Sequence, residues 1–145
     1  MTILNTILKL ETEDSIDLVN LTPAIQSWVD TTGVRNGQVL IFSRHTTTAL
    51  AINEYETRLL QDIKHYLRKL APPTVQYLHN DLHLRDVPED EPENAHSHLM
   101  AITLSTSEIV PLVDGKLALG TYQSVILFDL DGPRQRTVMI QVSGD

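Results

Sequence analysis

The sequence predicts an α+β fold in a single domain that covers residues 1–145. Segments in which apolar and polar residues alternate, as in half-buried strands, occupy the first twenty residues and the C-terminal third. Two segments with the periodicity of amphipathic helices lie between them. Because strands cluster at both ends, we expect a mixed or antiparallel, sandwich-like sheet with two main helices rather than a doubly wound fold. The length also fits one domain.

The N-terminal part is expected to contain two strands, a helix and a buried strand. The two strands fit a hairpin that turns at Glu13-Asp14. Thr22-Pro23 supplies an N-cap followed by a proline suited to the first helical turn, and Gly33 ends this helix. Residues 38–43 follow an Asn-Gly turn and carry consecutive apolar side chains, which predicts a central strand.

The middle of the chain is expected to contain an extended segment, a second helix, a long loop and a short helix. The β-branched run 46–48 favours extended backbone. Residues 56–70 carry an apolar helical stripe, and Pro72-Pro73 ends this helix abruptly. Residues 79–94 are polar and acidic and predict a long loop, a kind of segment that often carries function. Residues 95–104 fit a short helix.

The C-terminal third alternates again and predicts four strands separated by turns. Asp114-Gly115 and Asp131-Gly132-Pro133 have the composition of tight turns. The predicted strands cover residues 108–112, 116–119, 121–130 and 136–142.

The composition argues against several classes of partner. The formal net charge is −8 and the pI is about 5.1, so the surface repels nucleic acid and anionic lipid. No apolar run approaches the ~20 residues that span a bilayer, and the N-terminus lacks a signal-peptide pattern. The absence of cysteine fits a reducing compartment. We therefore expect a cytoplasmic protein that binds neither nucleic acid nor membranes, while capture of one small phosphate stays open.

Six histidines in a chain without cysteine raise the question of a metal site. Three neutral imidazoles around an open coordination position form a catalytic type of site. His45 follows the central strand, where it is either functional or a strand-end residue capped by a backbone carbonyl. The four-residue spacing of His79 and His83 is weak support, because no metalloprotease glutamate lies between them. His96 and His98 point in different directions on a strand or a helix, so only one can be a ligand.

Other candidate residues have an ordinary structural explanation beside the functional one. Arg134 and Arg136 alternate on one strand face, where they either protect an edge strand or grip a phosphate. Gly120 either forms a turn or admits a ligand close to the backbone. Glu54 is a base, a metal ligand or a helix-start residue. His65 lies opposite an apolar helical stripe and is expected to be solvated.

Five short motifs follow one another along nearly the whole chain. They are His45-Thr46-Thr47-Thr48-Ala49-Leu50 with Asn53-Glu54, Tyr77-Leu78-His79-Asn80, Asn94-Ala95-His96-Ser97-His98-Leu99, Gly115-Lys116-Leu117-Ala118-Leu119-Gly120-Thr121-Tyr122-Gln123, and Asp131-Gly132-Pro133-Arg134-Gln135-Arg136. In this order they resemble the YjbQ-type family, whose members are often described as secondary thiamine-phosphate synthases. Three positions depart from the pattern expected of the family: Tyr122 replaces tryptophan, Ser105 replaces glycine and Asp129 replaces glutamate.

The resemblance implies a single α+β domain that forms a homotrimer, with sites near the subunit boundaries. It also implies a metal cluster made by His45, His79 and His98. This set agrees with the argument that only one of His96 and His98 can be a ligand. His83 and His96 then support the ligands or have no part in the site. Zinc is the best match to histidine-only ligation of a divalent metal, although iron, nickel and copper also accept it.

The activity implied by the resemblance joins hydroxymethylpyrimidine diphosphate to thiazole phosphate and releases pyrophosphate. In this reading His45 and Glu54 are catalytic, and the residues that hold the phosphorylated substrate are Thr46, Thr47, Gly120, Gln123 and Arg134. Since the acidic surface does not attract anions at long range, local groups must hold the substrate. We therefore also consider this activity as a side reaction of the site. Two alternatives are a metal- or phosphate-binding module without turnover and a metal-assisted hydrolase of a small phosphorylated metabolite.

Overall fold

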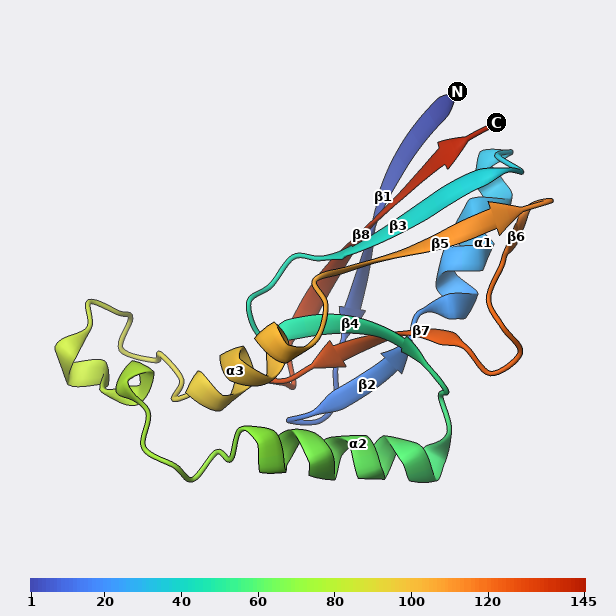
Figure 1. Cartoon of the computed structure of the whole chain (residues 1–145). Helices are drawn as coiled ribbons and strands as arrows, with labels where there is room; N and C mark the ends of the chain where they lie inside the picture. Colours follow the sequence, from blue (N-terminus) through green and yellow to red (C-terminus); the bar gives the residue numbers. More distant parts are fainter.

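The fold is built on two antiparallel sheets (Figure 1). In this computed structural model, which describes residues 1–145, the larger sheet has the order β1 (Thr2–Glu11), β8 (Gln135–Gly144), β3 (Gly37–Ser43), β5 (Ser107–Val113) and β6 (Lys116–Leu117). The smaller sheet has the order β2 (Asp17–Asn20), β7 (Ser124–Asp129) and β4 (Thr48–Asn53). All pairings are antiparallel. The predicted α+β class with sandwich-like sheets is confirmed.

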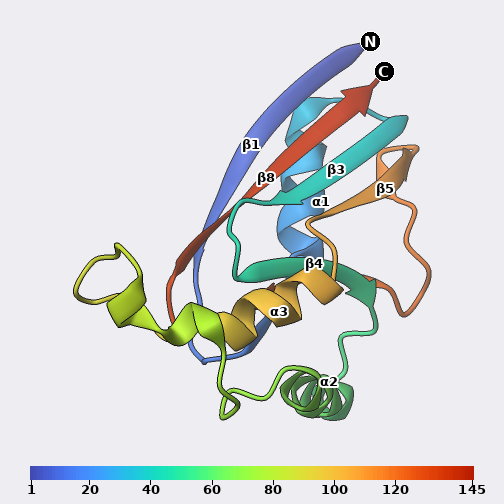
Figure 2. The same cartoon turned by 60° about the vertical axis from the view of Figure 1, so that its left-hand side comes forward.

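Three helices and two short 3₁₀ turns complete the structure. They are α1 (Thr22–Thr32), α2 (Thr57–Leu70), η1 (Leu78–Asn80), η2 (Leu82–Leu84) and α3 (Ala95–Thr103). Figure 2 shows α1 behind the larger sheet, whereas α2 and α3 lie on the face of the smaller sheet that is turned away from the larger sheet. No helix is long and apolar enough to cross a membrane.

The smaller sheet separates two apolar cores because successive side chains of a strand point to opposite faces. In β7, Val125 and Leu127 pack into the core shared with α1 and the larger sheet. The intervening Ile126 and Phe128 pack into the second core, beneath α2 and α3. The continuous apolar run of β7 is therefore explained by burial on both faces, as the completely buried pattern of Val125–Asp129 shows.

Both main helices form where the sequence predicts them. Gly33 ends α1 with a φ of 77°, in the left-handed region that favours glycine. Thr22 is the first residue of α1 rather than its cap, and its hydroxyl accepts a hydrogen bond from the Val125 N–H. Glu56 caps α2 by accepting a hydrogen bond from the Leu59 N–H.

The predicted N-terminal hairpin is wrong. β1 pairs along its whole length with β8, and β2 pairs with β7 in the other sheet. Between them the chain crosses from one sheet to the other, and the Thr12 N–H donates to the Arg134 carbonyl at the crossing point. Both strands had the expected alternation, but their partners lie more than one hundred residues away in the sequence.

Two other expectations are corrected near functional candidates. Thr46 and Thr47 lie in a turn, and extended backbone begins only at Thr48, the first residue of β4. β7 begins at Ser124, because Thr121 and Tyr122 form a turn instead of continuing the strand.

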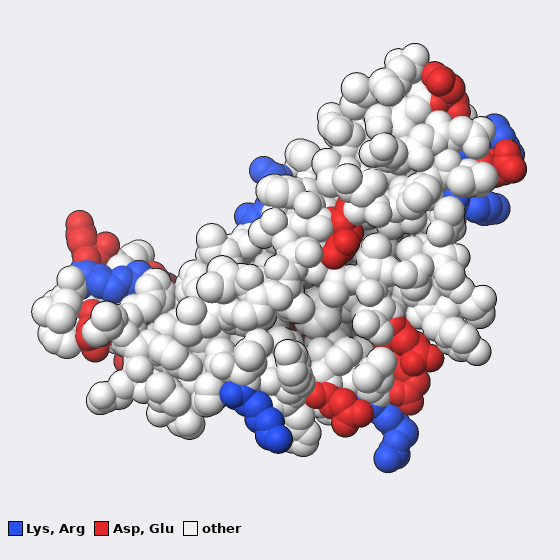
Figure 3. Space-filling view, viewed as in Figure 1, with Lys and Arg blue, Asp and Glu red and all other residues white.

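The predicted long loop is present and projects from the body as an arm that contains η1 and η2 (Figures 1 and 2). It joins α2 to α3, which itself packs against β4 and η1. In the view of Figure 3 charged side chains gather along the edge formed by α2 and at the ends of the molecule, while much of the body between them is uncharged.

Candidate functional site

A polar cavity of about 400 Å³ lies where the arm meets the body. It is bordered by the turn between β3 and β4, the end of the arm, α3 and the start of β8. None of its lining residues is hydrophobic; they are Arg44, His45, Thr46, Thr47, Glu91, Pro92, Asn94, His98, Arg134 and Arg136.

His45 enters this cavity because the chain leaves the larger sheet one residue after β3. The last β3–β8 pair is Ser43 with Val138. The next N–H of β8, that of Thr137, donates instead to Nε2 of His45 at 2.9 Å. The imidazole is thus held by a backbone donor, not by the carbonyl that we expected as its ordinary structural partner. Burial, then the nearby Arg136 charge, lowers the pKa of His45, so the ring is neutral near pH 7.

The floor of the cavity contains a buried ion pair. The Arg136 guanidinium donates to the two carboxylate oxygens of Asp129 at 3.0 and 2.7 Å. It also donates to the Thr47 hydroxyl at 2.9 Å, while the Thr12 hydroxyl donates to Asp129 at 2.6 Å. Burial by itself raises the pKa of Asp129, but these hydrogen bonds outweigh it and hold the pKa below its ordinary value.

A second pair stands at the rim. Arg134 donates to the backbone carbonyl and to the carboxylate of Asp131, at 2.8 and 2.9 Å. Asn94 donates to the same carboxylate oxygen at 2.7 Å, which ties the end of the arm to the loop before β8. Asp131 therefore neutralises much of the Arg134 charge and fixes its direction.

The third arginine differs from the other two. Arg44 is exposed and makes neither an ion pair nor a hydrogen bond within the chain. The one carboxylate that lines the cavity, Glu91, faces Arg85 at 3.6 Å. Since two arginines have aspartate partners and Glu91 has a cation of its own, Arg44 gives the cavity an excess positive charge.

His79 and His98 lie beside each other at the arm. Their rings meet edge to face with centroids 4.7 Å apart. Nε2 of His79 is buried and has no hydrogen-bond partner. Burial, then the neighbouring His79, lowers the pKa of the His98 ring, which also lines the cavity.

The predicted metal cluster of three histidines is not formed within one chain. No three His, Cys, Asp or Glu side chains lie in positions that could hold a metal ion. His79 and His98 are neighbours, but Nε2 of His45 is already occupied by the Thr137 N–H. The three rings therefore do not fit one shared ion in the protomer, and a divalent cofactor stays a prediction.

The remaining predicted site residues fall into two groups. Thr46, Thr47 and Arg134 line the cavity together with His45. Glu54 and Gln123 instead line a separate hollow of about 290 Å³ beyond the opposite end of β4, where Tyr122 is also found. Gly120 belongs to that second group, because its N–H donates to the Gln123 side chain at 2.8 Å. Within one chain, the predicted catalytic pair of His45 and Glu54 is thus divided between two places.

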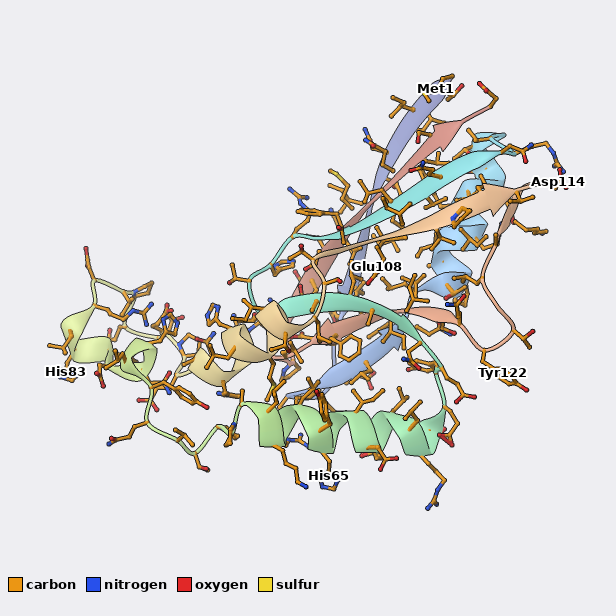
Figure 4. All side chains as sticks on the ribbon, viewed as in Figure 1. Met1, His65, His83, Glu108, Asp114 and Tyr122 are labelled. Carbon is orange, nitrogen blue, oxygen red and sulfur yellow. The ribbon has the colours of Figure 1, made fainter.

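The other histidines lie outside the cavity. His65 projects from the exposed side of α2, as expected, and His83 lies on the arm far from the body (Figure 4). His96 lines a smaller pocket together with Asp131 and Met100. Of the pair His96 and His98, only His98 lines the cavity, and a ligand role for either stays a prediction.

Sequence reasoning did not single out Arg44, Asn94 or Asp131 as members of one site. Arg44 directly precedes His45 at the end of a predicted central strand, and this position could have identified it. The bond between Asn94 and Asp131 joins residues 37 positions apart and has no local signal in the sequence.

Comparison with protein families identifies the group to which this arrangement belongs. Residues 6–145 match the family described as UPF0047 protein YjbQ-like. The chain belongs to the YjbQ/UPF0047 family. A UPF0047 protein of Methanothermobacter thermautotrophicus is 39% identical over 137 residues, which cover 94% of this chain and 90% of the relative. One from Archaeoglobus fulgidus is 39% identical over 134 residues, with 92% and 97% covered.

Solved structures extend the similarity to the whole fold. A YbjQ-like protein of unknown function from Sulfolobus solfataricus has a TM-score of 0.89 at 32% identity, and the match covers 99% of each chain. An uncharacterized YjbQ/UPF0047 protein from Clostridium acetobutylicum has a TM-score of 0.84 at 29% identity, covering 95% of this chain and 99% of that one. The YjbQ/UPF0047 fold therefore accounts for essentially the whole chain.

Proposed function

We propose that the cavity beside His45 binds the phosphate group of a small metabolite. The observation that carries this proposal is the unpaired Arg44 in a lining that holds two further arginines, each paired with an aspartate, and a single carboxylate, in a chain whose net charge is −8. Guanidinium groups bind phosphate through charge-assisted, directional hydrogen bonds. The absence of apolar lining residues also favours a strongly hydrated, polar ligand group over a hydrophobic one.

The lining residues would contribute to phosphate binding in different ways. Arg44 has no acidic partner, so its charge is fully available to an anion. Arg134 and Arg136 are aimed by Asp131 and Asp129, and they offer the guanidinium N–H groups that these carboxylates do not use. The exposed hydroxyl of Thr46 adds a neutral donor.

Isothermal titration calorimetry with inorganic phosphate and with pyrophosphate tests this proposal. Arg44→Ala should weaken binding by about tenfold or more, the loss expected for one hydrogen bond to a charged group. Arg58→Ala is a matched control, because Arg58 is an exposed residue of α2 outside the cavity. Equal affinity in wild type and both variants, or no heat of binding in any of them, would rule out the cavity as a phosphate site.

For the reaction, we propose a transferase of the thiamine-phosphate synthase type. The divalent metal that the family resemblance implies, such as zinc, would then be bound by ligands other than His45. The family resemblance supports this reaction, and two phosphorylated substrates suit a site rich in arginine. A second hollow of about 510 Å³, which Arg136 also lines together with Lys9 and Glu11, offers space for a second phosphorylated group. The test is formation of thiamine phosphate by purified protein, with and without chelator, against Arg44→Ala. Activity in both proteins alike would exclude this cavity as the catalytic centre.

A binding module without turnover is the second candidate. The observation that favours it is the position of Glu54, which lies outside the cavity and so cannot serve as its base within one chain. This candidate predicts phosphate binding by calorimetry but no product from the two thiamine precursors or from a panel of phosphate esters. Release of phosphate from one of those esters would instead identify a hydrolase.

We further propose that the protein is a cytoplasmic homotrimer. The outer face of the larger sheet carries a group of apolar side chains among polar ones: Ile7, Met139 and Phe42 lie side by side in the register, and Leu40 lies opposite Ile109. Exposed apolar patches of this kind favour association. Thr137, which holds His45, belongs to the same face, so a second copy covering the patch would border the cavity. The lack of cysteine suits the reducing cytoplasm.

A further inference from the structure

The hydrogen bond between Thr137 and His45 determines which ring nitrogen carries the proton. A backbone N–H can only donate, so Nε2 of His45 must offer its lone pair at 2.9 Å. A neutral imidazole has one protonated nitrogen. The proton therefore lies on Nδ1.

Nδ1 is free to act on a ligand. It makes no hydrogen bond within the chain, and it is not among the buried atoms that lack a partner. The ring lines the polar cavity beside Arg44 and Thr46. A neutral N–H group is thus available on a ring that lines the same cavity as the unpaired guanidinium.

We propose that His45 is held as the Nδ1–H tautomer and donates this hydrogen bond to a phosphate oxygen, instead of serving as a metal ligand. The donor role rests on the proposed phosphate site, whereas the tautomer follows from the contact with Thr137 alone. The proposal therefore gives His45 a role in binding phosphate, in place of the metal-ligand role that the family resemblance implies.

Metal ligation by His45 would conflict with its present contact. Coordination through Nε2 requires the lone pair that accepts from Thr137. Coordination through Nδ1 moves the proton to Nε2, where it would point at the Thr137 N–H. Either choice breaks the hydrogen bond that replaces the missing β3 partner of Thr137, and leaves a strand N–H unpaired.

Histidine-selective ¹⁵N NMR tests the tautomer directly. In the full chain, free of phosphate and metal at pH 7.5 (roughly one unit above the ordinary histidine pKa), His45 should show a protonated Nδ1 and an unprotonated Nε2. Adding zinc should leave both His45 signals unchanged. A protonated Nε2, or a zinc-induced shift of Nδ1, would overturn the assignment whether or not phosphate binds.

Two substitutions test the donor role. The side-chain amide of asparagine reaches about as far as Nδ1, and that of glutamine about as far as Nε2. His45→Gln keeps an acceptor for Thr137 but loses the Nδ1 donor, so phosphate affinity should fall by about tenfold. His45→Asn keeps a donor near Nδ1 and should lose less than about threefold. Circular dichroism verifies that both variants fold.

The outcomes separate this inference from the proposed function. Equal loss of affinity in the two variants, or a larger loss in His45→Asn, would refute the Nδ1 donor while the phosphate site remains. Failure of the wild-type protein to bind phosphate or pyrophosphate would refute the donor role together with the proposed function. The tautomer assignment would then still be decided by the NMR measurement.

Discussion

At the residue scale, the buried pair of Arg136 and Asp129 organises the candidate site. Arg136 is only 4% exposed and Asp129 is fully buried. Two hydrogen bonds join them, and Thr12 and Thr47 complete the network from the two sides. Because the attraction between the two charges offsets part of the cost of burying them, loss of one partner leaves the second buried and uncompensated.

Asp129→Asn should therefore destabilise the protein strongly. We expect the free energy of unfolding to fall by about 3–5 kcal/mol, the loss typical of breaking a buried ion pair. Urea denaturation followed by circular dichroism measures it. Asp62→Asn, on the exposed side of α2, makes the same chemical change outside any ion pair and should leave stability within about 0.5 kcal/mol. A loss below 1 kcal/mol in Asp129→Asn would show that the pair contributes little.

The sequence predicts some of these residues and not others, for a physical reason. His45 and Arg134 stand beside a strand or a turn with clear local signals, and both line the cavity. The importance of Asp129 depends on an arginine from the next strand and a threonine from the N-terminal crossing, 117 positions away. Contacts of this range have no periodicity that a single sequence could reveal.

At the element scale, α3 is attached to the sheet by a buried side chain. The hydroxyl of Ser97, which is completely buried, donates to the Leu130 carbonyl at 2.6 Å, just beyond the end of β7. This bond sets the position of α3 and thus of its neighbour His98, which lines the cavity. A buried carbonyl without a donor is costly, so the serine is needed for more than packing.

Ser97→Ala is expected to lower the free energy of unfolding by about 1–3 kcal/mol, since it leaves the Leu130 carbonyl unsatisfied. Thermal or urea unfolding measures this. Ser27→Ala, on the exposed surface of α1, removes a hydroxyl that makes no hydrogen bond and should change stability by no more than about 0.5 kcal/mol. Indistinguishable stabilities of the two variants would contradict the role assigned to Ser97.

The positions of the helices were predicted well, because local sequence patterns determine them. The partners of the strands were predicted poorly, because strand pairing depends on distant parts of the chain. The helices α1, α2 and α3 follow from apolar stripes, proline and glycine signals, and they form close to the expected residues. β1 and β2 were expected to pair with each other, yet they belong to different sheets. Alternation identifies a strand, but the choice of partner depends on contacts across the whole chain.

At the scale of the whole molecule, the free energy of unfolding should decrease in two steps as pH falls. Burial lowers the pKa of His45, His96 and His98, so the unfolded chain takes up more protons than the folded one as pH falls below about 6.5. Asp129, whose pKa is lowered by its hydrogen bonds, adds a second loss below about pH 4. Urea unfolding between pH 8 and pH 3 measures both.

The loss of stability that we attribute to the histidines can be tested separately. His96→Gln should make the decline between pH 7 and pH 5 shallower, because one of the three titrating groups is removed. A free energy of unfolding that stays constant over this interval in the wild-type protein would contradict the assignment.

Association can be tested on the apolar sheet face. Phe42 is 43% exposed and lies next to Met139 in the register. Phe42→Asp places a charge in the proposed contact and should convert a trimer, three times 16.3 kDa, into monomers by light scattering. Tyr66→Asp, an exposed aromatic on α2, is the matched control and should keep the trimer mass. A monomeric wild-type protein would remove the proposed contact.

The central claim is that the cavity beside His45 binds phosphate through its arginines and a neutral histidine. A crystal structure of the protein soaked with inorganic phosphate, with anomalous diffraction to locate any metal, tests it most directly. We expect phosphate within hydrogen-bond distance of Arg44 and of Nδ1 of His45, with Nε2 still on the Thr137 N–H. A metal bound to His45, or phosphate found only elsewhere on the protein, would contradict the claim.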